Sequence, residues 1–77
     1  MVWERRALEG LRRLRPTDTV GAKECVAAVR GLAAAPVPEA AFPLGGSGYF
    51  RLAVGDWRVL YHVDEKVVRV LNIGRAV

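Results

Sequence analysis

Seventy-seven residues are enough for one domain, and a chain of this length buries only about 60% of the surface that its unfolded form exposes. The single cysteine excludes an internal disulfide and fits a reducing cytosol, and twelve basic residues against eight acidic ones favour a polyanion or an acidic partner over a membrane surface. The sequence contains neither a membrane-spanning apolar stretch nor a signal peptide, so we expect a cytoplasmic protein.

Two helices are predicted in the first half of the chain. Apolar residues recur at helical spacing between Trp3 and Leu14, and Pro16 should end this helix because proline pushes the preceding residue out of the helical region. Asp18 is a plausible N-cap for a second helix that runs to about Ala34. Within it, Cys25 lies among Ala and Val residues, which predicts a small core residue rather than a ligand or nucleophile. The short link predicts an antiparallel helical hairpin.

The second half of the chain shows the period-two alternation of β-strands. A loop rich in proline and glycine is predicted over residues 35–47, and three strands follow it, over residues 49–54, 57–63 and 67–73. Only Gly55 and Asp56 separate the first two strands, and residues 64–66 separate the second from the third. Links this short require antiparallel hairpins.

The parity of the first hairpin divides its side chains into two sets. If Gly55 and Asp56 form the turn, one face is wholly apolar or aromatic and must cover the helices; it carries Phe50, Leu52, Val54, Trp57, Val59, Tyr61 and Val63. The opposite face contains no acid and carries Tyr49, Arg51, Ala53, Arg58, Leu60 and His62.

Arginines, a tyrosine and a histidine without a counter-acid favour the binding of an anion such as phosphate. If the last turn is formed by Glu65 and Lys66, Arg69 stands opposite His62 on the same face, and Arg75 closes its end. A three-residue turn would reverse the placement of Arg69. The alternative is that these arginines are ordinary solubilising residues of an exposed sheet face.

Two segments of the chain resemble a known family. The sequence GYFRLAVGDWRVLYHVD at residues 48–64 resembles the central signature of RelE/ParE-superfamily toxins of type II toxin–antitoxin systems, and VLNIGR at residues 70–75 resembles their last strand. The resemblance implies an α+β fold in which an N-terminal helical hairpin packs on a twisted antiparallel sheet of three to four strands, in a single domain spanning residues 1–77. The first strand of the family is reduced here to Met1 and Val2.

The resemblance also implies roles for individual residues. Arg51 and Arg58 fall where RelE-like nucleases place basic residues, and Arg75 occupies the His/Lys position after the glycine. The lysine often proposed as the base corresponds to Ala53, and the arginine that normally follows corresponds to Ala76. The C-terminal tyrosine of many of these nucleases has no counterpart before the chain ends.

Cleavage of RNA without a metal needs a base for the 2′-hydroxyl and a stabiliser of the charge on phosphorus. Arg51 and Arg58 suit the second task and cannot serve as the base, because guanidinium stays protonated. His62 is therefore the candidate proton acceptor, with packing against Tyr49 as the alternative. Tyr49, Arg69 and Arg75 are predicted to contact RNA, and no metal or cofactor is expected.

Three functions remain open at this point. The RelE branch cleaves mRNA on the ribosome and the ParE branch poisons DNA gyrase, so the partners would be the ribosome and mRNA or, alternatively, gyrase. A third possibility is a degraded toxin that only binds its antitoxin. All three imply a cognate antitoxin protein and an oligomer formed with it.

Overall fold

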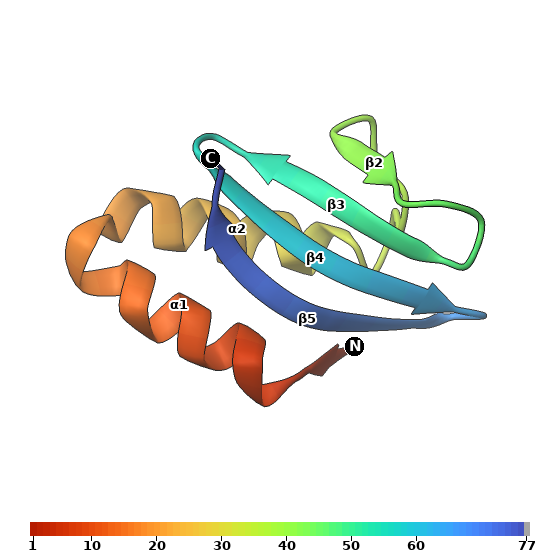
Figure 1. Ribbon diagram of the computed structural model, residues 1–77, viewed down its shortest axis with the longest axis horizontal. Helices are drawn as coiled ribbons and strands as arrows, with labels where there is room; N and C mark the ends of the chain where they lie inside the picture. The colour runs from red at the N-terminus through yellow and green to blue at the C-terminus, as the bar shows by residue number, and fades with distance from the viewer. Residues whose placement is uncertain (77) are drawn as a thin grey trace.

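The computed structural model describes residues 1–76; Val77, the last residue of the predicted domain, lies outside the described residues. Within residues 1–76 the chain forms two helices and five strands: β1 (Val2–Trp3), α1 (Arg5–Thr17), α2 (Thr19–Gly31), β2 (Ala41–Pro43), β3 (Tyr49–Val54), β4 (Trp57–Asp64) and β5 (Val67–Arg75). The strand order is β1-β5-β4-β3-β2, and the two helices cover one face of the sheet (Figure 1). Neither helix is long and apolar enough to cross a membrane.

The predicted α+β class is confirmed, with five strands rather than three to four: β1 corresponds to the shortened first strand that the resemblance implies, and β2 was not expected. β1 pairs in parallel with β5, and β2 pairs antiparallel with β3. The sheet is therefore mixed rather than purely antiparallel. β2 arises inside the segment predicted as a loop, and it ends in Pro43, a residue tolerated on an edge strand because its missing N–H is not needed for pairing there.

The first helix extends further than predicted. It continues through Pro16 to Thr17. Thr17 Oγ1 and the backbone N–H of Asp18 both donate to the carbonyl of Leu14, at 3.0 and 2.8 Å, and these bonds offset the hydrogen bond that proline cannot make. The prediction that Pro16 ends the helix was therefore wrong.

The second helix begins as expected, because the Asp18 side chain accepts a hydrogen bond from the N–H of Gly21 at 2.9 Å. It ends at Gly31, three residues before the expected Ala34. After Gly31 the chain continues in tighter i→i−3 hydrogen bonds, such as the one from the Ala33 N–H to the Arg30 carbonyl. This tighter turn explains why the helical sequence pattern extends beyond the α-helix.

The core lies between the helices and the inner face of the sheet, as the strand parity predicted. Tyr61, Val59 and Cys25 are all fully buried there. The Tyr61 hydroxyl donates to the Pro36 carbonyl at 2.7 Å, and burial raises the pKa of this phenol, so it remains a neutral donor. Burial also raises the pKa of the Cys25 thiol, which disfavours the reactive thiolate.

Both hairpin turns have the predicted register. Val54 pairs with Trp57 across Gly55 and Asp56, and Asp64 pairs with Val67 across the second turn. Glu65 in that second turn adopts a φ of 54°, the left-handed conformation that a two-residue hairpin turn demands. The register fixes which side chains share the face of the sheet that is turned away from the helices.

Candidate functional site

The candidate site lies on the face of the sheet turned away from the helices, which we call the open face. Figure 1 shows this face in front of α2. By register and strand alternation the open face carries Phe42, Tyr49, Arg51, Ala53, Arg58, Leu60, His62, Asp64, Val67, Arg69, Asn72 and Gly74. The parity predicted for the first hairpin is therefore confirmed, including the placement of both arginines away from the core.

Arg51 and Arg58 lie diagonally across the β3–β4 pair, because Arg58 stands opposite Ala53 and Arg51 opposite Leu60. Diagonal neighbours of this kind are about 7–8 Å apart. Arg58 Nη1 donates to the carbonyls of Gly55 and Trp57, both at 2.9 Å, so its guanidinium is held beside the turn. The remaining donors of the fork are available to an anion.

Two hollows of the open face share these arginines as walls. The first, the polar hollow, has a volume of about 380 Å³ and is lined by Arg51, Arg58, Leu60, Asn72, Gly74, Arg75 and Ala76. The second, the Phe42 hollow, has a volume of about 330 Å³ and is lined by Ala40, Phe42, Leu44, Arg51, Ala53 and Arg58. The arginine pair therefore stands on the ridge between two spaces.

His62 lies further along the same face. It is four residues from Arg58 on β4, or about 13 Å at roughly 3.3 Å per residue, but it is a diagonal neighbour of Arg51. Its ring packs against Tyr49 with 4.5 Å between the ring centroids. This is the packing contact that the sequence analysis gave as the alternative to a catalytic role for His62. Arg69 stands opposite His62, as expected for a two-residue turn.

The hydrogen bond of His62 determines its tautomer. Nε2 lies 3.0 Å from the carbonyl oxygen of Ser47. Because a carbonyl oxygen only accepts, the neutral imidazole carries its proton on Nε2 and leaves Nδ1 as an acceptor. Gly48 makes this position possible: its φ is +85°, and a Cβ there would lie 2.7 Å from the Val63 carbonyl oxygen and 3.1 Å from Nε2.

The open face contains one acid among its described residues, contrary to expectation. β4 runs one residue beyond the predicted Val63, and this places Asp64 on the same side as His62. Asp64 is a diagonal neighbour of Arg69. It lies at the opposite end of the face from Arg58, so the ridge between the two hollows keeps its uncompensated positive charge.

A β-bulge changes the position of Arg75. The pairing shifts between Leu60 and Tyr61, and Arg75 consequently stands opposite Trp57, whose side chain faces the helices. The Arg75 guanidinium carbon lies 5.8 Å from the centroid of the Trp57 ring, a cation–π contact. Arg75 also lines the polar hollow, so it remains next to Arg58 at the end of the sheet.

Asp18 connects this end of the sheet to the helices. Besides capping α2, its carboxylate accepts a hydrogen bond of 2.8 Å from Trp57 Nε1. This bond is the main reason why the pKa of the Asp18 carboxyl is lowered. The hydrogen bond from the Gly21 N–H and the charge of Arg75 also lower the pKa, whereas desolvation raises it. The sequence indicated only the N-cap role of Asp18, because Trp57, its second hydrogen-bond partner, is 39 residues away along the chain.

Sequence reasoning missed Phe42 and Asn72 on the open face, in addition to Asp64. Phe42 belongs to a three-residue strand hidden in a proline- and glycine-rich segment, where no alternation can be recognised. Asn72 reaches the open face opposite Leu60 only because the bulge shifts the register of β5. The one available signal for Phe42 was an aromatic residue within a segment otherwise rich in alanine, proline and glycine.

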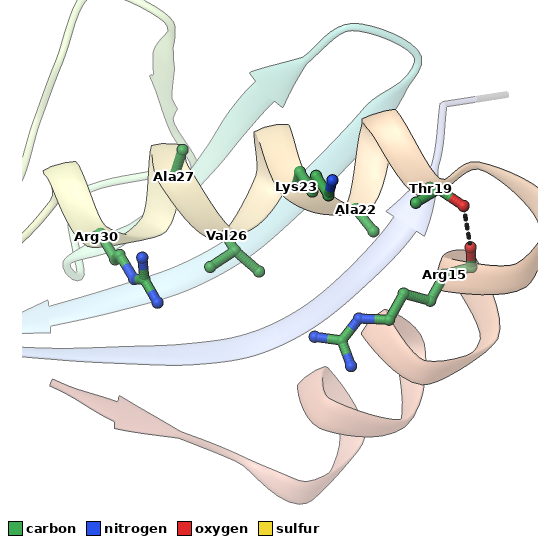
Figure 2. Close-up of a pocket in the computed structure, with 7 residues that line it drawn as sticks. All are labelled: Arg15, Thr19, Ala22, Lys23, Val26, Ala27 and Arg30. Carbon is green, nitrogen blue, oxygen red and sulfur yellow. Dashed lines mark hydrogen bonds between the residues drawn. The ribbon is translucent and has the colours of Figure 1, made fainter.

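A further hollow of about 410 Å³ lies on the helical layer, and we call it the helix groove. Its lining residues are Arg15, Thr19, Ala22, Lys23, Val26, Ala27 and Arg30. Figure 2 shows Ala22 and Val26 pointing into it, with Arg15 and Arg30 at its two ends. The groove combines an apolar floor with three cations. Within residues 1–76 no group of three His, Cys, Asp or Glu side chains could hold a metal ion.

Comparison with known proteins gives one family and several related folds. A family model described as the ParE toxin of the type II toxin–antitoxin system parDE matches residues 1–76. No curated protein matches the sequence significantly.

Three solved structures share the fold at low sequence identity. A YoeB/ParE toxin from Agrobacterium tumefaciens superposes with a TM-score of 0.82 at 18% identity, covering 99% of this chain and 96% of that one. The YoeB dimer from Staphylococcus aureus gives 0.76 at 13%, covering 99% and 94%. The DinJ–YafQ complex from E. coli gives 0.70 at 20%, covering 96% and 89%.

Proposed function

Because the chain belongs to the ParE toxin family of type II toxin–antitoxin systems, we propose that it is a toxin that inhibits translation by ribosome-dependent cleavage of mRNA. The observation that carries this proposal is the pair of arginines on the ridge between two hollows of the open face. Guanidinium groups bind phosphate oxygens through two parallel hydrogen bonds, and an uncovered sheet face allows a single strand to lie across them.

In the proposed reaction the scissile phosphate lies between Arg51 and His62, which are diagonal neighbours. Nδ1 of His62 accepts the proton of the 2′-hydroxyl, the 2′-oxygen forms a bond to phosphorus, and the bond from phosphorus to the 5′-oxygen breaks. The leaving 5′-oxygen takes a proton from water. Arg51 stabilises the additional negative charge that develops on the phosphate oxygens, and Arg58 holds the adjoining phosphate.

The remaining predicted site residues have supporting roles in this scheme. Tyr49 fixes the plane of the His62 ring through their contact. Arg69 and Arg75 add positive charge at the two ends of the face and contact RNA. Such contacts to phosphates make binding dependent on salt concentration.

We further propose a cognate antitoxin as the protein partner, in an oligomer that forms in the cytoplasm. One of the similar structures is the DinJ–YafQ toxin–antitoxin complex from E. coli. The helix groove supports this proposal, because its apolar floor and its cations Arg15, Lys23 and Arg30 complement an acidic amphipathic segment.

The test is the fate of mRNA in a translating extract to which purified protein is added. Toe-printing should show cuts at the codon in the ribosomal A site, and none in mRNA without ribosomes. The control is Arg12→Ala, which removes one exposed positive charge from α1 and should cut like the wild type. Intact mRNA at a concentration that arrests growth would reject the cleavage mechanism.

A second candidate is inhibition of DNA gyrase, favoured by the distance of His62 from Arg58 and by the ParE family match. A binding poison needs no proton acceptor. Supercoiling by purified gyrase should then fall as the protein is added, and unaffected supercoiling at saturation would reject this candidate. If induction causes no growth defect, neither activity is present, and the chain only binds its antitoxin.

A further inference from the structure

We propose that the Phe42 hollow is a base-binding subsite, in which the Phe42 ring stacks on the nucleobase next to the phosphate held by the arginine pair. This inference rests on the proposed function in that the ligand is single-stranded RNA. It names a recognition element that the sequence pattern did not reveal.

The first observation is the exposure of Phe42. Its side chain is 73% exposed, although large aromatic residues are usually buried. It stands directly opposite Arg51 on the open face, because Phe42 pairs with Arg51 between β2 and β3. An aromatic ring beside a guanidinium on a solvent-facing sheet provides both halves of a nucleotide site, a stacking surface and a phosphate ligand.

The second observation is the shape of the hollow beside the ring. Its volume of about 330 Å³ is bounded by Phe42 on one side and by the arginines on the other. Ala40 and Ala53 form small walls that leave room for a flat ligand. The hydrogen bonds from Arg58 to Gly55 and Trp57 hold its guanidinium at the rim, which keeps the space open.

The third observation is that the two hollows share Arg51 and Arg58. A phosphate bound on the ridge has one neighbouring nucleotide on each side. One base then enters the Phe42 hollow, and the next nucleotide enters the polar hollow, where the Asn72 amide can donate or accept hydrogen bonds. A single bound strand thus accounts for both spaces.

The charge of the site favours RNA over an apolar protein surface. Four of the six residues that line the hollow are apolar, but the other two are arginines, whose guanidinium groups an apolar partner would leave without an anion; the apolar four are Ala40, Phe42, Leu44 and Ala53. Stacking of a base on an aromatic side chain tolerates any base because every base has a π-face. We therefore expect this subsite to add affinity with little base preference.

The test uses a fluorescein-labelled 2′-O-methyl RNA heptamer, which has no free 2′-hydroxyl and cannot be cut, and a matched heptamer with abasic positions. Anisotropy at several salt concentrations gives the Kd of wild type, Phe42→Ala and Phe42→Tyr. Phe42→Ala should weaken binding of the base-bearing strand about 5- to 150-fold without changing the salt slope. It should leave binding of the abasic strand unchanged, and Phe42→Tyr should retain wild-type affinity.

The control is Val20→Ala, which shortens a side chain that is 67% exposed on α2. It should bind both strands like the wild type. Equal loss on both strands, or no loss on either, would overturn the subsite. Loss of antitoxin affinity alone in Phe42→Ala would assign the ring to a protein interface and would overturn it as well.

Cleavage separates this inference from the function on which it rests. If wild type and Phe42→Ala cut mRNA equally in the translating extract, the subsite fails and the proposed function stands. If base-dependent binding is found but no mRNA is cut, the proposed function fails and the subsite stands.

Discussion

The two ends of the open face are held in place in different ways. At the Arg58 end, the guanidinium bonds to two backbone carbonyls of the turn, and the neighbouring Trp57 bonds to Asp18 at the start of α2. At the His62 end, the ring contacts Tyr49 of its own hairpin and Ser47 of the preceding loop. The anion-binding end is thus braced by the helical layer, whereas the proton-accepting end depends on local backbone geometry.

This difference implies that binding and proton transfer can be separated by substitution. Changes at the His62 end should reduce the rate of cleavage and leave RNA binding in place. Changes at the Arg58 end should reduce both. Substitutions at each end of the open face test this separation.

The largest effect is expected for His62→Gln. The glutamine amide can still donate to the Ser47 carbonyl but cannot accept a proton, so the cleavage rate in a translating extract should fall about 10²- to 10⁴-fold. Affinity for the uncleavable heptamer should remain that of the wild type. A His62→Gln variant that cuts at the wild-type rate would show that the base lies elsewhere.

Arg58→Ala should reduce cleavage about 10²-fold and abolish growth inhibition, because the adjoining phosphate is no longer held and the scissile phosphate loses its position. It should also weaken heptamer binding and reduce the slope of log Kd against log salt by about 1. Far-UV circular dichroism should remain that of the wild type, since the side chain points away from the core. Unfolding of this variant would contradict the assigned strand parity.

Gly48→Ala tests the backbone geometry at the His62 end. The added Cβ would approach the Val63 carbonyl oxygen to 2.7 Å, at a φ that strains any residue except glycine. We expect a loss of about 1–3 kcal/mol in the free energy of unfolding, measured with urea. Gly31→Ala is the matched control, because its Cβ meets nothing within 4 Å and it lies in a helix.

The smallest effect is expected for Trp57→Phe, which removes the hydrogen bond to Asp18. This bond lowers the pKa of the Asp18 carboxyl in the folded state. Its contribution to stability is therefore fully present above the ordinary pKa of 3.8, and it is lost as the pH falls through the lower pKa of the folded state. The variant should therefore be less stable than wild type at pH 6, and the difference should shrink by pH 2. Thermal unfolding at both pH values measures this, and a constant difference would contradict the assigned role of the carboxylate.

The sequence predicted the features that depend on neighbouring residues. Two-residue turns and period-two alternation are local signals, so the pairing of Val54 with Trp57 and the arginine face followed directly. The features it missed depend on distant partners. The pairing of Phe42 with Arg51 and the shift that places Arg75 opposite Trp57 each require knowledge of a separate strand. Pro16 was misread because its helix is completed by hydrogen bonds from the two residues that follow it.

The carboxylate of Asp18 couples the first turn of α2 to the end of the sheet at Trp57. The same carboxylate caps α2 and accepts the hydrogen bond of the Trp57 indole. Arg75 lies over that indole, at the end of the sheet that carries Arg58. Fraying of the first turn of that helix would therefore loosen one wall of the polar hollow, even though helix and hollow lie in different layers. Any partner that tightens this turn would, by the same linkage, stiffen a surface it does not touch.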